Sequence, residues 1–361
     1  MQPHEAKRAR PCRPALGWTG PQQGECTRAA VLDVRPTANK LRAGPVASTI
    51  QDVPDIAVYV QAAPTDLTSW LALARRLENA GFRGLLMGDH PGSGSSPMPA
   101  LGAAAAVTRT LELGTCVVQA GVREPMHVAA DAATLDLLAP GRVMLGIGAG
   151  HTPREWEDIG SQRPSARQRA ERLAEFAVAV SRLLRGETVT VGGEHVALHD
   201  SRLDDLPAGR RVRLSVGGGH PLILRTAARH ADVVEVSSLG RTLADGHHHE
   251  VRWTQEDLRG KLQLVREEAR QAGNRPVVEV LVQVVSVTAH RAAAIEELTG
   301  RLPDTSAEDV ASTPFVLVGS HEQMAAQMLA QAGEFGITSY VVREPAVPAL
   351  ERVLALLRSE S

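Results

Sequence analysis

The dipeptide Asp89-His90 lies where a strand gives way to a loop, a common place for reactive side chains. It follows the buried run 84–88 and precedes Pro91-Gly92. An imidazole exchanges protons near neutral pH, and the neighbouring carboxylate could tune its pKa. A lone histidine is more often structural, so both a general acid or base and a structural residue stay open for His90 on these grounds.

The triplet Gly217-Gly218-Gly219 lies between a buried run and a helical one. Without side chains, its backbone N–H groups can approach a phosphate at the helix N-terminus, where the helix dipole favours an anion. A tight turn that requires positive φ would explain the same residues. Their position late in the chain favours the phosphate, because barrel folds concentrate phosphate sites there.

The run Gly146-Ile147-Gly148-Ala149-Gly150 is a poor match to a dinucleotide-binding fingerprint. It is followed by His151-Thr152-Pro153-Arg154 instead of a helix start, and its last spacing differs. Glycines at a strand end allow the close approach of a flat ligand or of another strand. We favour the ligand and keep packing as the alternative.

Several other chemistries lack the residues that they need. Lysines occur only at positions 7, 40 and 261, which disfavours Schiff-base and pyridoxal-phosphate enzymes. No Gly-x-Ser-x-Gly elbow is present for a hydrolase triad. The tract His247-His248-His249 lacks the spacing of a zinc site, so we expect a solvated loop there and no bound metal.

Strands and helices must alternate along the chain to position these residues. Eight apolar runs, each followed by a helical stretch, indicate parallel strands covered on both faces. Eight such units in about 300 residues favour an α/β fold of the closed (β/α)8 type, a TIM barrel with insertions, over an open doubly wound sheet. The predicted strands are 56–60, 84–88, 111–118, 142–146, 212–216, 233–236, 277–287 and 339–342, and the clearest helices are 67–80, 165–184 and 255–272.

Further runs are predicted as insertions into this barrel. Residues 189–198 are expected to form a small hairpin, and 291–313 a polar helical insertion. Ligands of such a barrel bind at the carboxyl ends of its strands. The residues expected at those ends are Gln61, Asp89-His90, 116–119, 148–151, 217–220 and Ser237-Ser238.

Ordered motifs from about Asp55 to the C-terminus resemble the bacterial luciferase-like family. They are Gly81-Phe82 with 87–90, 113–117, Arg123-Glu124-Pro125, 133–136, 140–143 with 145–150, 185–187, 193–195, 227–232 and 314–320. The resemblance implies a TIM barrel. The motifs are similar to those of the branch that uses the deazaflavin coenzyme F420, whereas other branches use reduced FMN.

The resemblance also implies roles for single residues. His90 is similar to the histidine that moves a proton in deazaflavin-dependent sugar-phosphate dehydrogenases, and Cys116-Val117 corresponds to a non-proline cis peptide behind the central ring. The glycine triplet with the two serines matches the phosphate site, and Gln119 matches a ring-edge contact. The predicted cofactor-binding residues are Asp89, Cys116, Val117, Gln119, Gly150, Gly217, Gly218, Gly219, Ser237 and Ser238, and the predicted catalytic residues are His90 and His151.

One position departs from the pattern that the resemblance provides. The sugar-phosphate dehydrogenases place a glutamate after the residue that matches Gly150, and this chain has His151. His151 is a second acid, a pocket-lining residue or a structural one. Together with the scarcity of lysines, the replacement argues against a sugar phosphate as substrate.

We therefore expect an oxidoreductase that transfers a hydride between reduced F420 and a small organic or specialised-metabolite substrate, reducing an activated C=C or C=N bond. One alternative is an FMN-dependent luciferase-like monooxygenase. Another is a flavin-binding protein without turnover.

Composition limits the partners and the compartment. A net charge of -2 and 3% aromatic residues give no basis for binding nucleic acid or a membrane. Three scattered cysteines and an N-terminus without an apolar stretch predict a cytoplasmic protein. Residues 1–53 are predicted to be a disordered extension, and 54–361 the luciferase-like domain. A homodimer is expected to form through the early helices, with the alanine-rich stretch 103–107 as one candidate.

Overall fold

The computed structural model describes residues 54–359 apart from 93, 205–211, 243–248 and 303–304. The predicted extension, residues 1–53, therefore lies outside the described residues. Within the described part, no helix is both long enough and apolar enough to cross a membrane.

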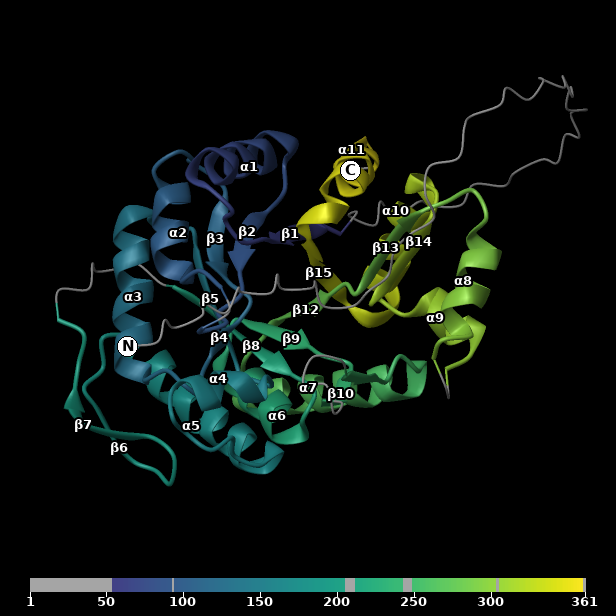
Figure 1. The fold of residues 1–361 in the computed structure, drawn as a ribbon. Helices are drawn as coiled ribbons and strands as arrows, with labels where there is room; N and C mark the ends of the chain where they lie inside the picture. Colours follow the sequence, from purple (N-terminus) through teal and green to yellow (C-terminus); the bar gives the residue numbers. More distant parts are fainter. Residues whose placement is uncertain (1–53, 93, 205–211, 243–248, 303–304, 360–361) are drawn as a thin grey trace, which may run out of the picture. The chain divides into compact units, whose positions relative to one another are not determined.

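Eight parallel strands close into a barrel, as predicted (Figure 1). β1 pairs with β2 on one side and with β15 on the other, and the pairing of β3 with β5 completes the ring. β3 and β4 are two parts of one barrel strand, separated by the peptide bond between Cys116 and Val117. The barrel strands are β1 (Ala57–Gln61), β2 (Gly84–Met87), β3 (Glu112–Thr115) with β4 (Val118–Gln119), β5 (Val143–Gly148), β8 (Arg213–Gly218), β9 (Val233–Val236), β12 (Val277–Leu281) and β15 (Ile337–Arg343).

A helix follows each of these strands and packs on the outside of the barrel. The helices bury an apolar stripe against the strands, with residues such as Leu77 and Phe176 fully buried. The covering helices are α1 (Leu67–Ala80), α2 (Pro97–Ala105), α3 (Pro125–Leu138), α5 (Ala166–Leu184), α6 (Pro221–His230), α7 (Gln255–Ala272), α10 (His321–Phe335) and, after the short 3-10 turn η1 (Glu344–Ala346), α11 (Val347–Ser359).

The closure between β3 and β5 depends on glycine. A Cβ atom on Gly114 would lie 2.0 Å from the Met144 carbonyl oxygen, and one on Gly146 would lie 2.1 Å from the Thr115 carbonyl oxygen. The Thr115 hydroxyl donates to the Gly146 carbonyl at 2.8 Å and accepts from the Gly146 N–H at 3.0 Å. Gly114 of β3 and Gly146 of β5 thus let the two strands approach, which for Gly146 is the packing alternative of the sequence analysis.

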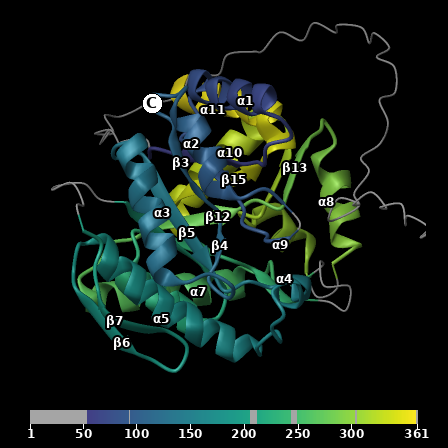
Figure 2. The ribbon, with the colours of Figure 1, turned by 60° about the vertical axis from the view of Figure 1, so that its left-hand side comes forward.

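Insertions decorate the barrel. The hairpin of β6 (Val189–Gly192) and β7 (Ala197–Ser201) lies beside α5, close to its predicted place (Figure 2). Three further pieces have no counterpart among the predicted elements: the short helix α4 (Pro153–Asp158), the antiparallel pair β10 (Leu239–Thr242) and β11 (His249–Val251), and β14 (Val316–Gly319). The polar insertion contains α8 (Arg291–Thr299) and α9 (Ala307–Ser312).

The prediction of one long strand over 277–287 is wrong. The chain forms β12 and then β13 (Val284–Val287), which pairs with β14 outside the barrel. The Val282 N–H still donates to Val341 of β15, whereas the next N–H, that of Gln283, donates to the Phe315 carbonyl. The sequence reads as one apolar run because both β12 and β13 are strands with apolar residues, and only their pairing partners differ.

Candidate active site

His90 and Glu155 form the central contact at the carboxyl ends of the strands. His90 follows β2, and Glu155 reaches it from α4, whose first turn contains Pro153. The His90 Nδ1 lies 2.6 Å from Glu155 Oε1. Glu155 is buried, and its other oxygen accepts from the Gln119 amide. One face of the imidazole is therefore anchored, while the ring is 49% exposed.

This pairing controls the charge of His90. The hydrogen bond that the ring donates to Glu155 is the main cause that raises the pKa of His90; burial of the ring opposes the rise, and the charges of Glu155 and Asp89 reinforce it. The carboxylate also fixes Nδ1 as the nitrogen that points to Glu155.

Asp89 is clamped within the protein. Arg123 donates to both of its oxygens, at 2.7 and 3.0 Å, and the Gln119 N–H donates to Oδ2 at 3.3 Å. The carboxylate is 2% exposed. Its predicted contact with a cofactor stays a prediction, since in this geometry the side chain holds the loop that carries His90.

His151 belongs to a row of three imidazoles. Its ring lies edge-on to His90 at 6.1 Å and edge-on to His249 at 4.7 Å between centroids. Burial lowers the pKa of His151 to about 4, and the charges of His249, His90, Arg163 and Arg169 act in the same direction. His151 is thus neutral at neutral pH and is poorly suited to be the second acid.

The expectation of a solvated loop at 247–249 is wrong for its last residue. His249 begins β11 and is partly buried against His151. His247 and His248 lie outside the described residues. The antiparallel pairing of β11 with β10 is what carries this imidazole to the barrel rim.

The peptide bond between Cys116 and Val117 is cis, as the resemblance implies. The Cys116 carbonyl accepts from the Gln61 amide at 2.5 Å, and the thiol points to Glu235 Oε2 at 3.6 Å inside the barrel. Burial raises the pKa of the Cys116 thiol well above its usual range, so this cysteine is unreactive.

The two glutamates beneath this peptide bond are buried in the barrel interior. Burial raises the pKa of Glu235. Burial, with the nearby charge of Glu235, raises the pKa of Glu279 to about 8, and Glu279 accepts a hydrogen bond from Ser339 at 2.7 Å. Burial thus favours the protonated form of both carboxyls.

The glycine residues at the strand ends are packed against protein. A Cβ atom on Gly217, Gly218 or Gly219 would lie 2.6–2.9 Å from Glu235, Ile223 or Ser237, respectively. None of these three described glycines has positive φ, so the tight-turn alternative does not hold. Gly150 does have positive φ, and a Cβ there would lie 2.5 Å from Gln119.

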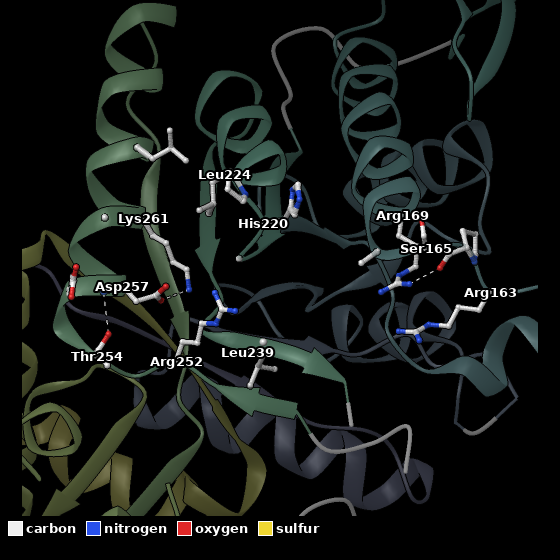
Figure 3. A pocket seen from close by; sticks show the side chains of 18 of the residues that line it. Arg163, Ser165, Arg169, His220, Leu224, Leu239, Arg252, Thr254, Asp257 and Lys261 are labelled. Carbon is white, nitrogen blue, oxygen red and sulfur yellow. Dashed lines mark hydrogen bonds and ion pairs between the residues drawn. The ribbon is translucent and has the colours of Figure 1, made fainter. Parts of the chain in front are cut away.

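A pocket of about 1210 Å³ opens beside the triplet. Gly219 and the N-cap residue His220 of α6 line it together with Lys261 of α7 (Figure 3). The Lys261 Nζ donates to the Ser237 carbonyl at 3.0 Å, lies 3.5 Å from Ser238 Oγ and pairs with Asp257 at 2.5 Å. Of the predicted phosphate residues, Gly219 thus lines the pocket and the two serines contact its lysine, whereas Gly217 and Gly218 do not line it.

Arg163 and Arg169 occupy the opposite side of the same pocket. Arg169 donates to the carbonyls of Gly150 and Pro164 at 3.1 and 2.7 Å, which joins this side to the strand end before His151. Burial, with the charge of Arg163, lowers the pKa of Arg169 to about 10. The charges of Arg163 and Arg169 also act on His151, although none of the three imidazoles lines this pocket.

Residues 49–303 match the sequence family described as luciferase-like monooxygenase. This match covers most of the chain. The chain belongs to the luciferase-like monooxygenase family. The family resemblance of the sequence motifs is thereby confirmed.

Several members of this family are similar to the chain over part of its length. An F420-dependent glucose-6-phosphate dehydrogenase of Beutenbergia cavernae is 36% identical over 192 residues, which are 51% of this chain and 56% of that protein. A 4-hydroxyprotoasukamycin monooxygenase of Streptomyces nodosus subsp. asukaensis is 38% identical over 148 residues, 39% of each chain. The chain thus spans about half the length of the curated relatives that it matches.

Solved structures of luciferase-like fold cover more of the chain. An F420-dependent secondary alcohol dehydrogenase in complex with an F420-acetone adduct superposes with a TM-score of 0.66 at 19% identity, covering 84% of this chain and 99% of that one. The EDTA monooxygenase of Chelativorans sp. BNC1 superposes with a TM-score of 0.65 at 15% identity, covering 85% and 94%. At these identities the likeness shows the shared barrel.

The structure adds residues that the sequence analysis missed. Glu155 lies in a helix of six residues, too short to give a period, and only its place after a strand end could have indicated it. Lys261 enters the sequence analysis only as one of three lysines, without a predicted role. Its spacing of four residues from Asp257 indicates a shared helix face, but not that this face turns to the strand ends.

Proposed function

We propose that the protein is an oxidoreductase that binds reduced F420 and reduces an activated C=C or C=N bond of a small organic or specialised-metabolite substrate. The observation that carries this proposal is the His90–Glu155 pair at the strand ends of the barrel, in which the carboxylate raises the pKa of the imidazole and so favours its protonated form. The F420-dependent relatives support the choice of coenzyme.

The donor groups of the pocket suit a coenzyme with a negatively charged tail. Gly219, Lys261 and the N-terminus of α6 would hold its phosphate, with Ser237 and Ser238 beside them. When bound, the coenzyme supplies the hydride. The protein supplies the proton: Glu155 holds Nδ1, and His90 gives a proton from Nε2 to the reduced substrate.

His151, with its lowered pKa, and the neighbouring His249 would then line the substrate side. The presence of Lys261 weakens the argument from lysine scarcity against a sugar phosphate. The replacement of the expected glutamate by His151 still supports a different substrate. The homodimer and the cytoplasmic location remain predictions.

The test is a fluorescence titration of the purified protein with F420 and, side by side, with FMN. We expect quenching at micromolar F420 and no comparable response to FMN. Absence of F420 binding at micromolar concentration would contradict the proposal.

An FMN-dependent monooxygenase is the second candidate, because a monooxygenase is among the relatives and FMN also ends in a phosphate. It predicts tight FMN binding and oxygen consumption with reduced FMN.

A further inference from the structure

The two sides of the large pocket carry separate positive charges. On one side Lys261 lies with Gly219 and Arg252; on the other, Arg163 and Arg169 form what we call the arginine wall. Figure 3 shows the basic groups of both sides directed toward the space between them. A single phosphate held at Gly219 and Lys261 would occupy one side and leave the arginine wall without a counter-ion.

The arginine wall contains a hydrogen-bond donor that lacks an acceptor. Arg163 Nε is buried and has no hydrogen-bond partner among the described residues. A buried N–H without an acceptor is costly, and here a second guanidinium, that of Arg169, lies close enough for its pKa to be lowered by the charge of Arg163. The carboxylates that line the pocket, Glu256 and Asp257, are on α7, and Asp257 is paired with Lys261.

Arginine recognises carboxylates, as it does phosphates, through two parallel hydrogen bonds, and here the phosphate has its own site at Gly219 and Lys261. Arg169 already uses Nε and one terminal nitrogen on backbone carbonyls, which orients its plane. Arg163 comes just before the N-cap of α5, so its backbone is fixed by that helix start. The wall is therefore preorganised for carboxylates.

We propose that Arg163 and Arg169 bind the glutamyl carboxylates of the F420 tail, as a subsite separate from the phosphate site. This inference rests on the proposed function. F420 carries glutamates beyond its phosphate, and FMN carries none, so the arginine wall favours F420 over FMN. A carboxylate of the substrate has the same chemistry and is the competing source.

The test compares three deazaflavins by fluorescence titration: the riboside without phosphate, the coenzyme without glutamates, and the coenzyme with several glutamates. For the native protein we expect the glutamylated form to bind about tenfold more tightly than the form without glutamates, the low end of what a charge-assisted hydrogen bond contributes. Equal affinities would overturn the inference and leave the proposed function standing. Absence of binding by all three would refute the proposed function itself.

Matched variants locate the effect. Arg163→Gln should abolish the tenfold preference and leave the affinity for the form without glutamates nearly unchanged. Arg167→Gln removes the same charge from the exposed side of α5, where Arg167 pairs with Glu171, and should keep the preference. Loss of the preference in both variants would mean unspecific attraction and would overturn the inference.

Two further measurements complete the test. Arg163→Lys keeps the charge but not the planar fork, and it should lose most of the preference; full retention would contradict the carboxylate wall. If Arg163→Gln keeps the preference but raises KM for a carboxylate-bearing substrate alone, the wall serves the substrate and the inference is wrong.

Discussion

The surroundings of His90 and the large pocket differ in how their charged side chains are paired. Around His90 the carboxylates are matched within the protein: Glu155 holds His90, and Arg123 holds Asp89. In the large pocket, Arg163 and Arg252 have no side-chain ion pair among the described residues. The charges around His90 are thus paired without a ligand, whereas we propose that a ligand supplies the counter-charge in the large pocket. Substitutions around His90 should alter turnover or stability, and those in the large pocket should alter binding.

The largest effect is expected from His90→Ala. If His90 moves the proton, its loss should lower turnover by about 10²- to 10⁴-fold while coenzyme binding persists. Steady-state kinetics and fluorescence titration would separate the two. His230→Ala, at the exposed end of α6, is the control and should be neutral. Unchanged turnover in the His90 variant would favour a flavin-binding protein without catalysis.

The next largest effect is expected on the free energy of unfolding, which should respond differently to substitutions near His90 and in the large pocket. Arg123→Leu leaves the buried carboxylate of Asp89 without its partner and should cost about 3 kcal/mol of unfolding free energy. Arg252→Leu in the pocket should change it by less than about 0.5 kcal/mol. Urea denaturation measures both.

A surface pair calibrates this comparison. Arg76 and Glu351 form an exposed ion pair at 2.7 Å, and Arg76→Leu should cost less than about 1 kcal/mol. Similar losses for Arg123 and Arg76 would mean that Asp89 is not a buttress of the site.

Glu155→Gln should act on the pH dependence. The amide cannot stabilise the imidazolium as the carboxylate does, so the pKa of His90 should fall toward its ordinary value. If activity needs protonated His90, the alkaline limb of the pH–rate profile should therefore move to lower pH in this variant. A pH–rate profile measures this, and an NMR titration of the imidazole should show the same shift. An unmoved alkaline limb would argue against His90 as the acid.

The smallest effect is expected from His151→Gln. The folded pKa of His151, about 4, is below its unfolded value, so acidification from about pH 6.5 to 4 drives a proton onto the unfolded chain first and costs stability. Removing the ring should reduce this acid sensitivity by about 1 kcal/mol, or about 2–4 °C in Tm. Parallel melting curves at pH 4.5 and 7 would reveal it, and identical sensitivity would place the titration elsewhere.

The barrel could be predicted because its local signals agree with one another. Helices α1 and α7 have their predicted ends, since Asp66 and Thr254 cap their starts and Gly81 and Gly273 adopt the left-handed conformation at their ends. The run 277–287 could not be divided from sequence, because both halves are apolar and only the tertiary pairing changes.

The site was predicted less completely than the fold. A strand-end position singles out His90, but the partner Glu155 comes from an insertion whose path is set by packing. The strand-end glycines were found from the sequence, but their role was not. Their lack of side chains is visible in the sequence, but whether a ligand or a neighbouring strand uses the space depends on contacts such as that of Gly146 with Thr115.

The position of Arg163 and Arg169 beside His151 ties ligand binding to proton uptake. Both guanidinium charges help to lower the pKa of His151, so an anion seated against them offsets part of that influence and raises the proton affinity of the imidazole. By thermodynamic reciprocity, acidification must then increase the affinity for the anion. Calorimetric titrations in two buffers of different ionisation enthalpy would register the transferred proton as a difference in apparent heat.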